Sequence, residues 1–350
     1  MTQEKTIEQP IAADIKTTPL PPKKNRGKLR VALLCVAAFL AAAVIFTFLS
    51  PLPMAYIGRA FMSGGMSVPP DDYAQRQSRV TAIKNLSYPS KFKDNTADIY
   101  LPTGPGPHPV ILWAHGGAFV GGDKSDIEVY ATALASEGYA AVCINYRRAP
   151  EAKYPTPVMQ TDEAYAWLKT VAAEHSLDTG RLVLAGDSAG AHIAGQYAAI
   201  QINAAYAADM GMEAAVPPET LKAVLLFCGP YSVEKIANTG DVLTRFFLSR
   251  MVWAYAGTRH WQDHFSEQGT LINHVTSDFP PAFISDGNTG SFEPHGRELA
   301  EKLRQAGAEV DSFFMDTSEA ITKHEYQFIM NSPAGIESFK RTLEFLEKHV

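Results

Sequence analysis

The sequence predicts an α/β fold with a mostly parallel central sheet and helices on both faces. Two observations support this fold. From about residue 80 onward, segments rich in β-branched residues alternate with longer stretches of helical spacing. Several strand segments, such as 110–113, are also apolar at consecutive positions, which a strand requires when neither side of its pleat meets water. No internal repeat interrupts the pattern, so we expect one domain over 71–350.

Individual elements follow from the same two signals. The segments with strand composition are 96–101, 110–115, 140–146, 182–185, 223–227, 282–285 and 310–315. Those with helical length and spacing are 127–136, 158–175, 189–208, 294–306 and 337–349. The segment 230–279 breaks the alternation and is rich in aromatic residues: Phe246, Phe247, Trp253, Tyr255, Trp261 and Phe265. We expect it to form either a lid or acyl pocket over a site, or an ordinary packed helix pair.

Composition and charge exclude several classes of protein. With 46% hydrophobic and 19% charged residues, wholesale disorder is not expected. The net charge is −6, but the first 30 positions carry an excess of basic over acidic residues, so the body of the chain is acidic and unsuited to nucleic acid. Cys35, Cys143 and Cys228 have neither metal-site nor disulfide-framework spacing. We therefore expect free thiols, no metal and no cofactor.

The N-terminal region predicts a membrane anchor. Residues 1–28 are rich in Pro, Lys and Thr and are expected to form a disordered basic tail. Residues 31–49 carry no charge, and a helix of that length is roughly 28 Å long, enough to span a bilayer. We assign 29–50 as a single transmembrane helix, with a cleaved signal peptide as the alternative. The basic cluster before it places the N-terminus in the cytoplasm and the domain outside, in the periplasm or extracellular space.

A short apolar strand leads directly into a glycine-flanked serine. Residues 182–185 are followed by Gly186-Asp187-Ser188-Ala189-Gly190 and then by an alanine-rich helical stretch. Small residues two positions either side of Ser188 allow the tight strand-to-helix turn that exposes a nucleophilic hydroxyl above a sheet. The helix that follows adds unsatisfied N–H groups and a positive dipole end, which favour a developing oxyanion. Ser188 is the predicted nucleophile.

A second glycine-rich loop follows the strand at 110–115. In His115-Gly116-Gly117-Ala118-Phe119 the small residues let backbone N–H groups approach a substrate carbonyl, as an oxyanion hole requires. The predicted donors are the N–H groups of Gly117, Ala118 and Ala189, with Gly116 as a further contributor.

Together these motifs resemble the α/β-hydrolase superfamily, most nearly the hormone-sensitive-lipase-like carboxylesterases. His115 to Ala118 is similar to their His-Gly-Gly-Gly motif, and Gly186 to Gly190 matches their Gly-Asp-Ser-Ala-Gly elbow. The segment 146–157, with Tyr-Arg-Arg-Ala-Pro-Glu and Tyr-Pro-Thr-Pro, is similar to the family segment after the next strand. The resemblance covers about 80–345 and implies serine-dependent hydrolysis of carboxylic esters, often with short acyl chains.

The base and the acid should lie near the C-terminus, since the triad order in this fold is serine, acid, histidine. His324, in Lys-His-Glu-Tyr-Gln-Phe, is the predicted base. Relatives carry the acid in the loop after the strand at 282–285, but here Gly290 occupies that slot. Asp286 is the first substitute and Glu293 the second. A remote acid such as Asp316, or a dyad without an acid, stays open.

The expected chemistry is two-step acyl transfer through Ser188 on a small-molecule ester with a short- to medium-chain acyl or acetyl group. An amidase, a deacetylase or an envelope transacylase would keep the same motifs and differ in acceptor. A catalytically weak binding protein on a hydrolase fold is the alternative from another class, and Gly290 motivates it. The sequence does not determine the oligomeric state.

Overall fold

The computed structural model describes residues 26–62, 67–236 and 238–350, and it divides into two compact units with the boundary between Phe48 and Leu49. The first unit contains α1 (Arg26–Leu49). Within it, Gly27–Leu49 has a mean hydropathy of 2.8 and its apolar surface is not buried. Among the described residues, this is the one helix long and apolar enough to cross a membrane, and a signal sequence would share these properties. Most of the predicted tail, 1–25, lies outside the described residues.

One eight-stranded sheet organises the second unit. Its order is β1-β2-β4-β3-β5-β6-β7-β8, with β2 antiparallel to both its neighbours and all other pairs parallel. The strands are β1 (Val80–Ser87), β2 (Thr96–Pro102), β3 (His108–Ala114), β4 (Ala140–Ile144), β5 (Leu177–Asp187), β6 (Leu221–Phe227), β7 (Ala282–Asp286) and β8 (Val310–Phe314). The predicted α/β fold with a mostly parallel sheet is confirmed.

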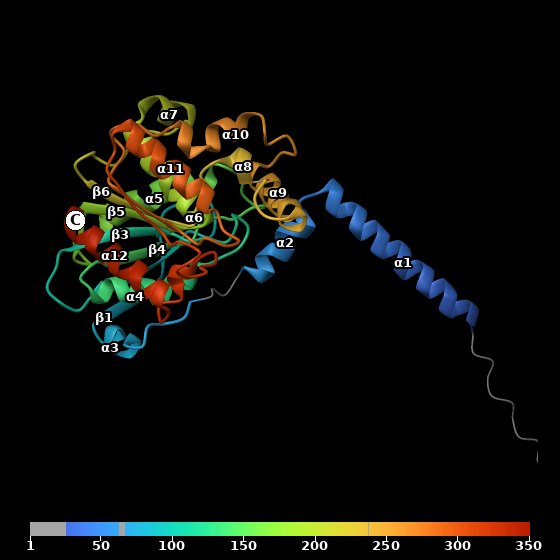
Figure 1. The fold of residues 1–350 in the computed structure, drawn as a ribbon, viewed down its shortest axis with the longest axis horizontal. Helices are drawn as coiled ribbons and strands as arrows, with labels where there is room; N and C mark the ends of the chain where they lie inside the picture. Colours follow the sequence, from blue (N-terminus) through green and yellow to red (C-terminus); the bar gives the residue numbers. More distant parts are fainter. Residues whose placement is uncertain (1–25, 63–66, 237) are drawn as a thin grey trace, which may run out of the picture. The chain divides into compact units, whose positions relative to one another are not determined.

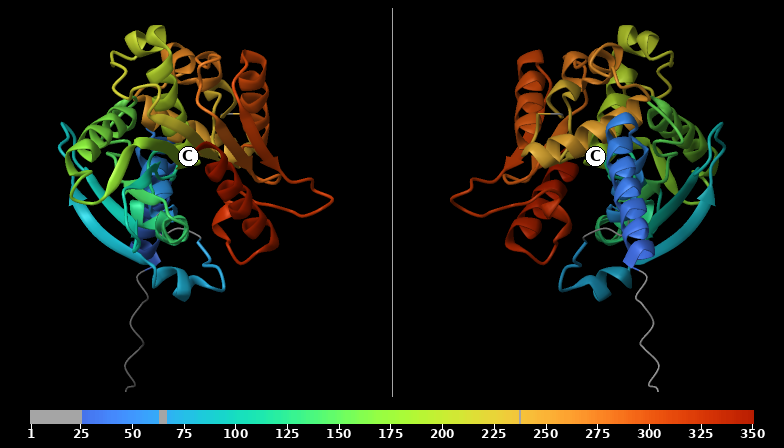
Figure 2. Two further views of the ribbon diagram at one scale, coloured as in Figure 1. Left: turned by 90° about the vertical axis from the view of Figure 1, so that its left-hand side faces the viewer. Right: turned by 90° about the vertical axis from the view of Figure 1, so that its right-hand side faces the viewer.

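Helices cover both faces of this sheet (Figures 1 and 2). On one face lie α5 (Thr156–Val171), α6 (Ala189–Ile202) and α11 (Glu293–Ala306); on the other lie α4 (Glu128–Ser136) and α12 (Pro333–His349). Along β3, Val110 and Leu112 join the first core, while Ile111 and Trp113 join the second. The consecutive apolar residues of this strand are therefore explained by burial on both sides.

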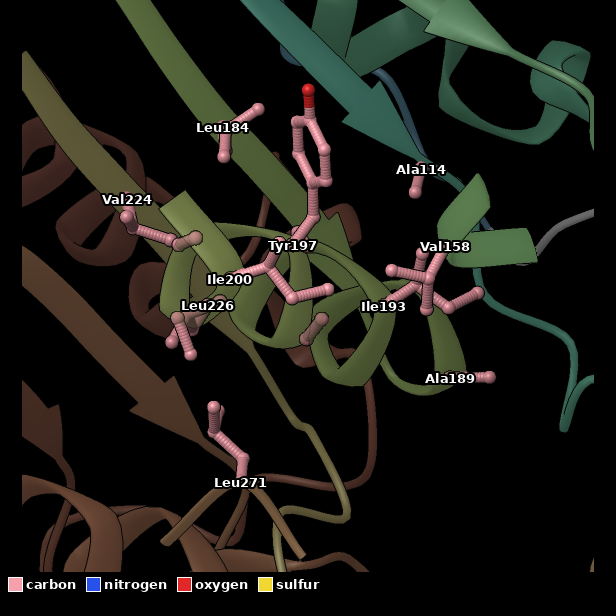
Figure 3. Packing of buried hydrophobic residues seen from close by; sticks show 14 of the residues in the cluster. Ala114, Val158, Leu184, Ala189, Ile193, Tyr197, Ile200, Val224, Leu226 and Leu271 are labelled. Atoms are coloured by element: carbon pink, nitrogen blue, oxygen red, sulfur yellow. The ribbon is translucent and has the colours of Figure 1, made fainter. Parts of the chain in front are cut away.

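Helix α6, which follows Ser188, is deeply buried against the sheet. In α6 every residue from Ala189 to Gln201 is buried. Its Ile193 and Ile200 belong to the same buried cluster as Leu184 of β5 and Leu226 of β6 (Figure 3). Each such side chain contributes about 1.5–3 kcal/mol on burial, so the start of α6 is held firmly at the carboxyl edge of the sheet.

Several elements differ from the predictions. The predicted helix 189–208 is wrong in its length: it is α6 followed by α7 (Ala204–Asp209), because Asn203 is extended and its side chain accepts the Tyr206 N–H as an N-cap. β5 begins five residues earlier than expected. The unpredicted elements are β1, α2 (Leu52–Phe61), α3 (Tyr73–Gln77), η1 (Lys124–Ile127) and η3 (Tyr326–Phe328).

The irregular segment between β6 and β7 is helical. It contains α8 (Val233–Ile236), α9 (Val242–Ala256), α10 (His264–Gly269) and η2 (Leu271–Asn273), and α9 lies beside α2 (Figure 1). Of the six aromatic residues named in the sequence analysis, Tyr255, Trp261 and Phe265 are buried in the core. Among these six, Phe247 is the one that lines the cavity described below.

Candidate active site

The turn between β5 and α6 consists of Ser188 alone. Its backbone has φ 49° and ψ −118°, a strained conformation for a residue with a side chain. The turn closes only with glycine on either side: a Cβ atom on Gly186 would overlap the carbonyl of Gly190, and one on Gly190 would overlap the carbonyl oxygen of Ala114. The Ser188 N–H donates to the Phe227 carbonyl at the end of β6, 2.8 Å away. This geometry projects the hydroxyl from the carboxyl edge of the sheet.

His324 lies next to this hydroxyl. It follows β8, just before η3, and its Nε2 is 3.0 Å from Ser188 Oγ. The Phe292 ring meets the imidazole edge to face, with centroids 5.5 Å apart. Desolvation lowers the pKa of His324 to about 4, so the ring is neutral at pH 7. The fold thus brings together two residues that are 136 positions apart in the sequence.

A serine hydroxyl lies between His324 and the first candidate acid. Ser291 Oγ is 2.7 Å from His324 Nδ1 and donates to Asp286 Oδ1. A hydroxyl has one proton to give, so Ser291 accepts from the imidazole Nδ1–H while it donates to the carboxylate. This chain of bonds fixes the tautomer that leaves Nε2 as an acceptor toward Ser188. Ser291 was not among the predicted residues; its one sequence signal is its position beside Gly290.

Asp286 is buried at the end of β7, with 1% of its surface exposed. Desolvation raises its pKa to about 7, and hydrogen bonds from Ser291 and Cys228 oppose this rise. The carboxyl is therefore close to half ionised at neutral pH. Its hydrogen-bonded connection to His324 runs through the Ser291 hydroxyl.

Glu293, the second candidate acid, is paired with an arginine on its own helix. Glu293, in the first turn of α11, forms an ion pair with Arg297 at 2.6 Å, and no hydrogen bond joins it to His324 in the described part of the chain. Asp316 accepts from the Ser318 N–H at the protein surface. Gly290 lines the cavity with φ 62°, and there is open space where its side chain would be.

Three potential metal ligands meet beside the histidine. Atoms of Cys228, Asp286 and His324 lie within 4.8 Å of one another, the one such group among the described residues. Burial raises the pKa of the Cys228 thiol well above its usual range, which favours the neutral thiol over the thiolate that binds metals. Both His324 nitrogens already face serine hydroxyls. This donor set does not fit a metal.

The glycine-rich loop after β3 turns sharply toward Ser188. Gly117, Ala118 and Phe119 have φ values of 110°, 51° and 65°, and a Cβ atom on Gly117 would overlap the Gly121 carbonyl. Glycine adopts a positive φ readily, but two successive non-glycine residues in this sparsely populated region are typical of a functional loop. Gly117 and Ala118 line the same cavity as Ser188.

The predicted donors differ in their availability. Ala189 is the first residue of α6, so its N–H has no acceptor within the helix, and it lines the cavity together with Gly117 and Ala118. The Gly116 N–H, in contrast, donates to Asp187 Oδ2 at 2.8 Å. This bond engages the Gly116 donor, so the predicted contribution of Gly116 stays a prediction for which the structure offers less support than for Gly117, Ala118 and Ala189.

Two carboxyl groups connect the elbow to the glycine-rich loop. Asp187 Oδ1 accepts from the Trp113 indole at 2.7 Å, and the Asp187 carboxyl is hydrogen-bonded to Glu325. Burial raises the pKa of both groups, that of Glu325 to about 7 and that of Asp187, which the Glu325 charge raises further, well above its ordinary value. The pair therefore shares a proton at neutral pH. Glu325, which the sequence analysis did not single out, also lines the cavity.

A cavity of about 720 Å³ opens at Ser188. Its lining includes residues of α9 at helical spacing, Thr244, Phe247, Leu248 and Met251, together with the elbow and His324. The volume lies within the range of small-molecule sites, which are mostly apolar with a few polar groups. The cavity therefore combines apolar side chains of α9 with the Ser188 hydroxyl in one lining.

An elbow at the carboxyl end of a central strand, in a mostly parallel eight-stranded sheet, defines an α/β-hydrolase. Comparison with known proteins gives the family: the BD-FAE profile matches residues 97–303, more than half of the chain. The chain belongs to the BD-FAE family, among the α/β-hydrolase carboxylesterases related to the hormone-sensitive-lipase-like esterases. The resemblance inferred from the motifs is confirmed.

Individual relatives are distant. The carboxylesterase NlhH of Mycobacterium tuberculosis is 30% identical over 251 residues, which are 69% of this chain and 73% of that protein. LipM of the same species, a probable carboxylic ester hydrolase, is 27% identical over 57% of this chain, and the match spans only 46% of its length. Esterase B from Lactobacillus rhamnosis shares the fold with a TM-score of 0.69 at 19% identity, over 92% of this chain and 96% of that one.

Proposed function

We propose that this chain is a serine esterase that cleaves carboxylic esters through an acyl-enzyme on Ser188. The observation that carries the proposal is the hydrogen-bonded series from Ser188 to His324, Ser291 and Asp286. It supplies a nucleophile, a neutral base with a fixed tautomer and a buried carboxylate at the end of the series. The family membership of the chain supports the same reaction class.

The proposed reaction has two steps. His324 Nε2 takes the Ser188 hydroxyl proton as Oγ attacks the ester carbonyl carbon, and the N–H groups of Gly117, Ala118 and Ala189 receive the oxyanion. The carbon–oxygen bond to the alcohol then breaks as His324 returns the proton to the leaving oxygen. Water attacks the acyl-enzyme with the same base, which releases the carboxylic acid and restores Ser188.

Asp286 acts in this proposal through Ser291. Ionised Asp286 polarises the Ser291 hydroxyl, whose oxygen holds the Nδ1–H of His324 and stabilises the imidazolium formed in each step. Asp286 is the first of the two predicted acids. In this proposal it is connected to His324 through the Ser291 hydroxyl and not by a direct hydrogen bond. Ser291 is thus proposed as a positioning residue.

Variants at Ser291 test the bridge. Ser291→Ala is expected to lower kcat about 10²- to 10³-fold with little change in KM, because the imidazolium loses its stabilising partner. Ser291→Thr keeps a hydroxyl and should retain activity within about tenfold of wild type. The measurement is steady-state hydrolysis of a p-nitrophenyl ester across pH.

Ser291→Val is the matched control for the threonine variant, since it has the same shape without the hydroxyl. If valine and threonine at position 291 give equal kcat values, the hydroxyl has no role and the bridge is refuted. A purely structural role for Ser291 would also leave the pH dependence of the residual activity unchanged.

The proposed substrate is an ester with a short- to medium-chain acyl or acetyl group. Relatives include a carboxylesterase and, in Salmonella choleraesuis, an acetyl esterase 28% identical over 63% of this chain, and the α9 wall of the cavity is apolar. Because its Phe247 and Met251 line the same cavity as Ser188, we propose that this segment forms the acyl pocket.

Matched p-nitrophenyl esters and anilides test the reaction class. We expect hydrolysis of the esters and little of the anilides. Faster release from the anilides would favour an amidase or deacetylase, and acceleration by an added alcohol acceptor would favour a transacylase. The alternative of a catalytically weak binding protein rested on Gly290, and the Asp286–Ser291 connection supplies the carboxylate that this position lacks.

We also propose that α1 is a retained anchor with a cytoplasmic N-terminus and an extracytoplasmic catalytic domain. Its length and hydropathy support a span, and the basic residues before it support the orientation. A reporter enzyme fused after Val350 should be active only outside the cytoplasm. Activity in the cytoplasm alone would reverse the orientation.

A further inference from the structure

Helix α2 presents an apolar face to the surroundings. Its exposed side chains are Leu52, Tyr56, Ile57, Ala60 and Phe61, and Phe61 is 86% exposed. These residues lie along one side of the helix, opposite the buried Ala55 and Gly58. A helix that is apolar on its buried side and on its exposed side as well is not typical of a protein surface in water.

The rest of α2 is fixed to the catalytic unit. Its Arg59 donates to the Val120 carbonyl at 2.7 Å, to the Ala149 carbonyl at 2.6 Å and to the Glu151 carboxylate at 2.5 Å. Gly58 allows the close approach of Phe247 on α9. The exposed face of α2 is therefore held in a fixed orientation on the catalytic unit.

The start of this surface lies beside α9 (Figure 1), and both helices contribute residues to the lining of the cavity. Phe61 lines the cavity from α2, and Asp241 and Thr244 line it from the start of α9. Between these two, Val242 and Leu243 are each 76% exposed. We call Leu52, Tyr56, Ile57, Phe61, Val242 and Leu243 the rim.

Chain connectivity determines what this rim meets. The candidate span Gly27–Leu49 ends three residues before α2 begins at Leu52. Three residues reach at most about 11 Å, so a chain anchored by this span keeps the start of α2 at the bilayer surface. Tyr56 is a residue type enriched at membrane interfaces, and α2 contains no acidic residue that anionic lipid would repel.

We propose that the rim docks onto the lipid bilayer that holds the anchor, so that the cavity receives amphipathic esters directly from the membrane. The inference rests on the proposed anchor and deepens the proposed function by naming where the substrate comes from. Docking immerses the apolar side chains at the interface and places the cavity mouth there as well.

A fluorescent probe in the full chain, reconstituted into phosphatidylcholine vesicles, tests the docking itself. In a Cys35→Ser background, where Cys143 and Cys228 are buried, NBD is attached at Val242→Cys or, as control, at Ile336→Cys. Ile336 is also an exposed apolar residue, but it lies on α12. We expect at least about threefold stronger quenching by doxyl-labelled lipid at position 242 than at 336, because shallow insertion brings the probe to the interface.

A kinetic comparison tests the consequence for substrate delivery. Val242 and Leu243 do not line the cavity, so the double variant V242S/L243S should hydrolyse p-nitrophenyl acetate in solution at the wild-type rate. For the acetyl ester of a long-chain alcohol dissolved in the vesicles, the kcat/KM of this double variant should fall about tenfold, since two apolar contacts with lipid are lost. The control I336S should change neither rate.

The possible outcomes distinguish a failure of the docking inference from a failure of the esterase or anchor proposals on which it rests. If the wild-type protein does not hydrolyse p-nitrophenyl acetate, the proposed esterase activity is refuted, while the NBD probe still reports on docking. Failure of the full chain to float with vesicles would overturn both anchor and docking. Flotation with equal quenching at positions 242 and 336 would overturn docking alone. A probe response without lipid that rises with protein concentration would assign the rim to a second copy of the chain and refute the bilayer as its occupant.

Discussion

Ser188→Ala is expected to lower kcat about 10⁶-fold, the largest effect of any substitution in this chain. Removing the nucleophile of a serine hydrolase costs about as much as removing the whole catalytic group, because its members act as a unit. The measurement is single-turnover and steady-state hydrolysis of a p-nitrophenyl ester. In parallel, a fluorophosphonate probe should label the wild type at Ser188 and leave the variant unlabelled.

The fold of the variant must be intact for this result to count. Alanine removes one oxygen without changing the backbone demand at φ 49°, so circular dichroism and Tm should match the wild type. If the intact wild-type protein resists the fluorophosphonate, the esterase is excluded and a binding protein on a hydrolase fold takes its place. Residual activity in S188A above about one per cent would assign the nucleophile elsewhere.

Asp286→Asn is expected to lower kcat about 10⁴-fold while leaving KM nearly unchanged. The physical reason is the direction of the hydrogen bonds. Asp286 accepts the Ser291 proton, whereas an asparagine NH₂ would donate to Ser291 Oγ and turn its hydroxyl toward His324 Nδ1. The imidazole would then carry its proton on Nε2 and could not accept from Ser188. Substitution by alanine should also lower turnover, by at least about tenfold.

The same variant predicts a change in pH dependence. Asp286 must be ionised to stabilise the imidazolium, and its pKa is about 7, so wild-type kcat/KM should rise as pH increases through about 7. Asp286→Asn removes that limb and leaves only the loss of activity below about pH 4, where His324 becomes protonated. A wild-type profile that is flat from pH 5 to 8 would contradict this assignment.

Stability gives an independent readout for Asp286. Its pKa of about 7 in the folded protein exceeds the value of about 3.9 of an unfolded chain, so the folded state binds the proton more tightly. Stability therefore falls as pH rises from about 4 to about 7, by at most about 4 kcal/mol. Asp286→Asn should raise Tm at pH 8 and have a smaller effect at pH 5.

Glu293→Ala is the matched control for a carboxylate near the site. Glu293 pairs with Arg297 on the surface of α11, so its loss should change kcat less than about threefold. If the alanine variants of Asp286 and Glu293 both keep more than a tenth of wild-type turnover, neither residue is the acid. A strong loss with Glu293 alone would transfer the role to it.

The sequence by itself determined the features that depend on neighbouring residues. Consecutive apolar residues in β3 require cover on both faces, which gave the α/β class, and the glycines around Ser188 reflect overlaps of backbone atoms within a single turn. His324 was predicted as the base because its position after the last strand follows from chain order. Each of these patterns is local or sequential, so it can be read without coordinates.

Only the tertiary structure decided how the residues around the histidine connect. Whether a carboxylate at the end of β7 reaches His324 depends on the path of the following loop, and that path places the Ser291 hydroxyl between them. The Gly116 N–H looked like its neighbours in the sequence, yet the approach of Asp187 engages it. The exposed face of α2 likewise became visible only when packing showed which side of the helix was covered. Hydrogen-bond direction and burial are properties of contacts between distant segments, and residue order alone does not specify them.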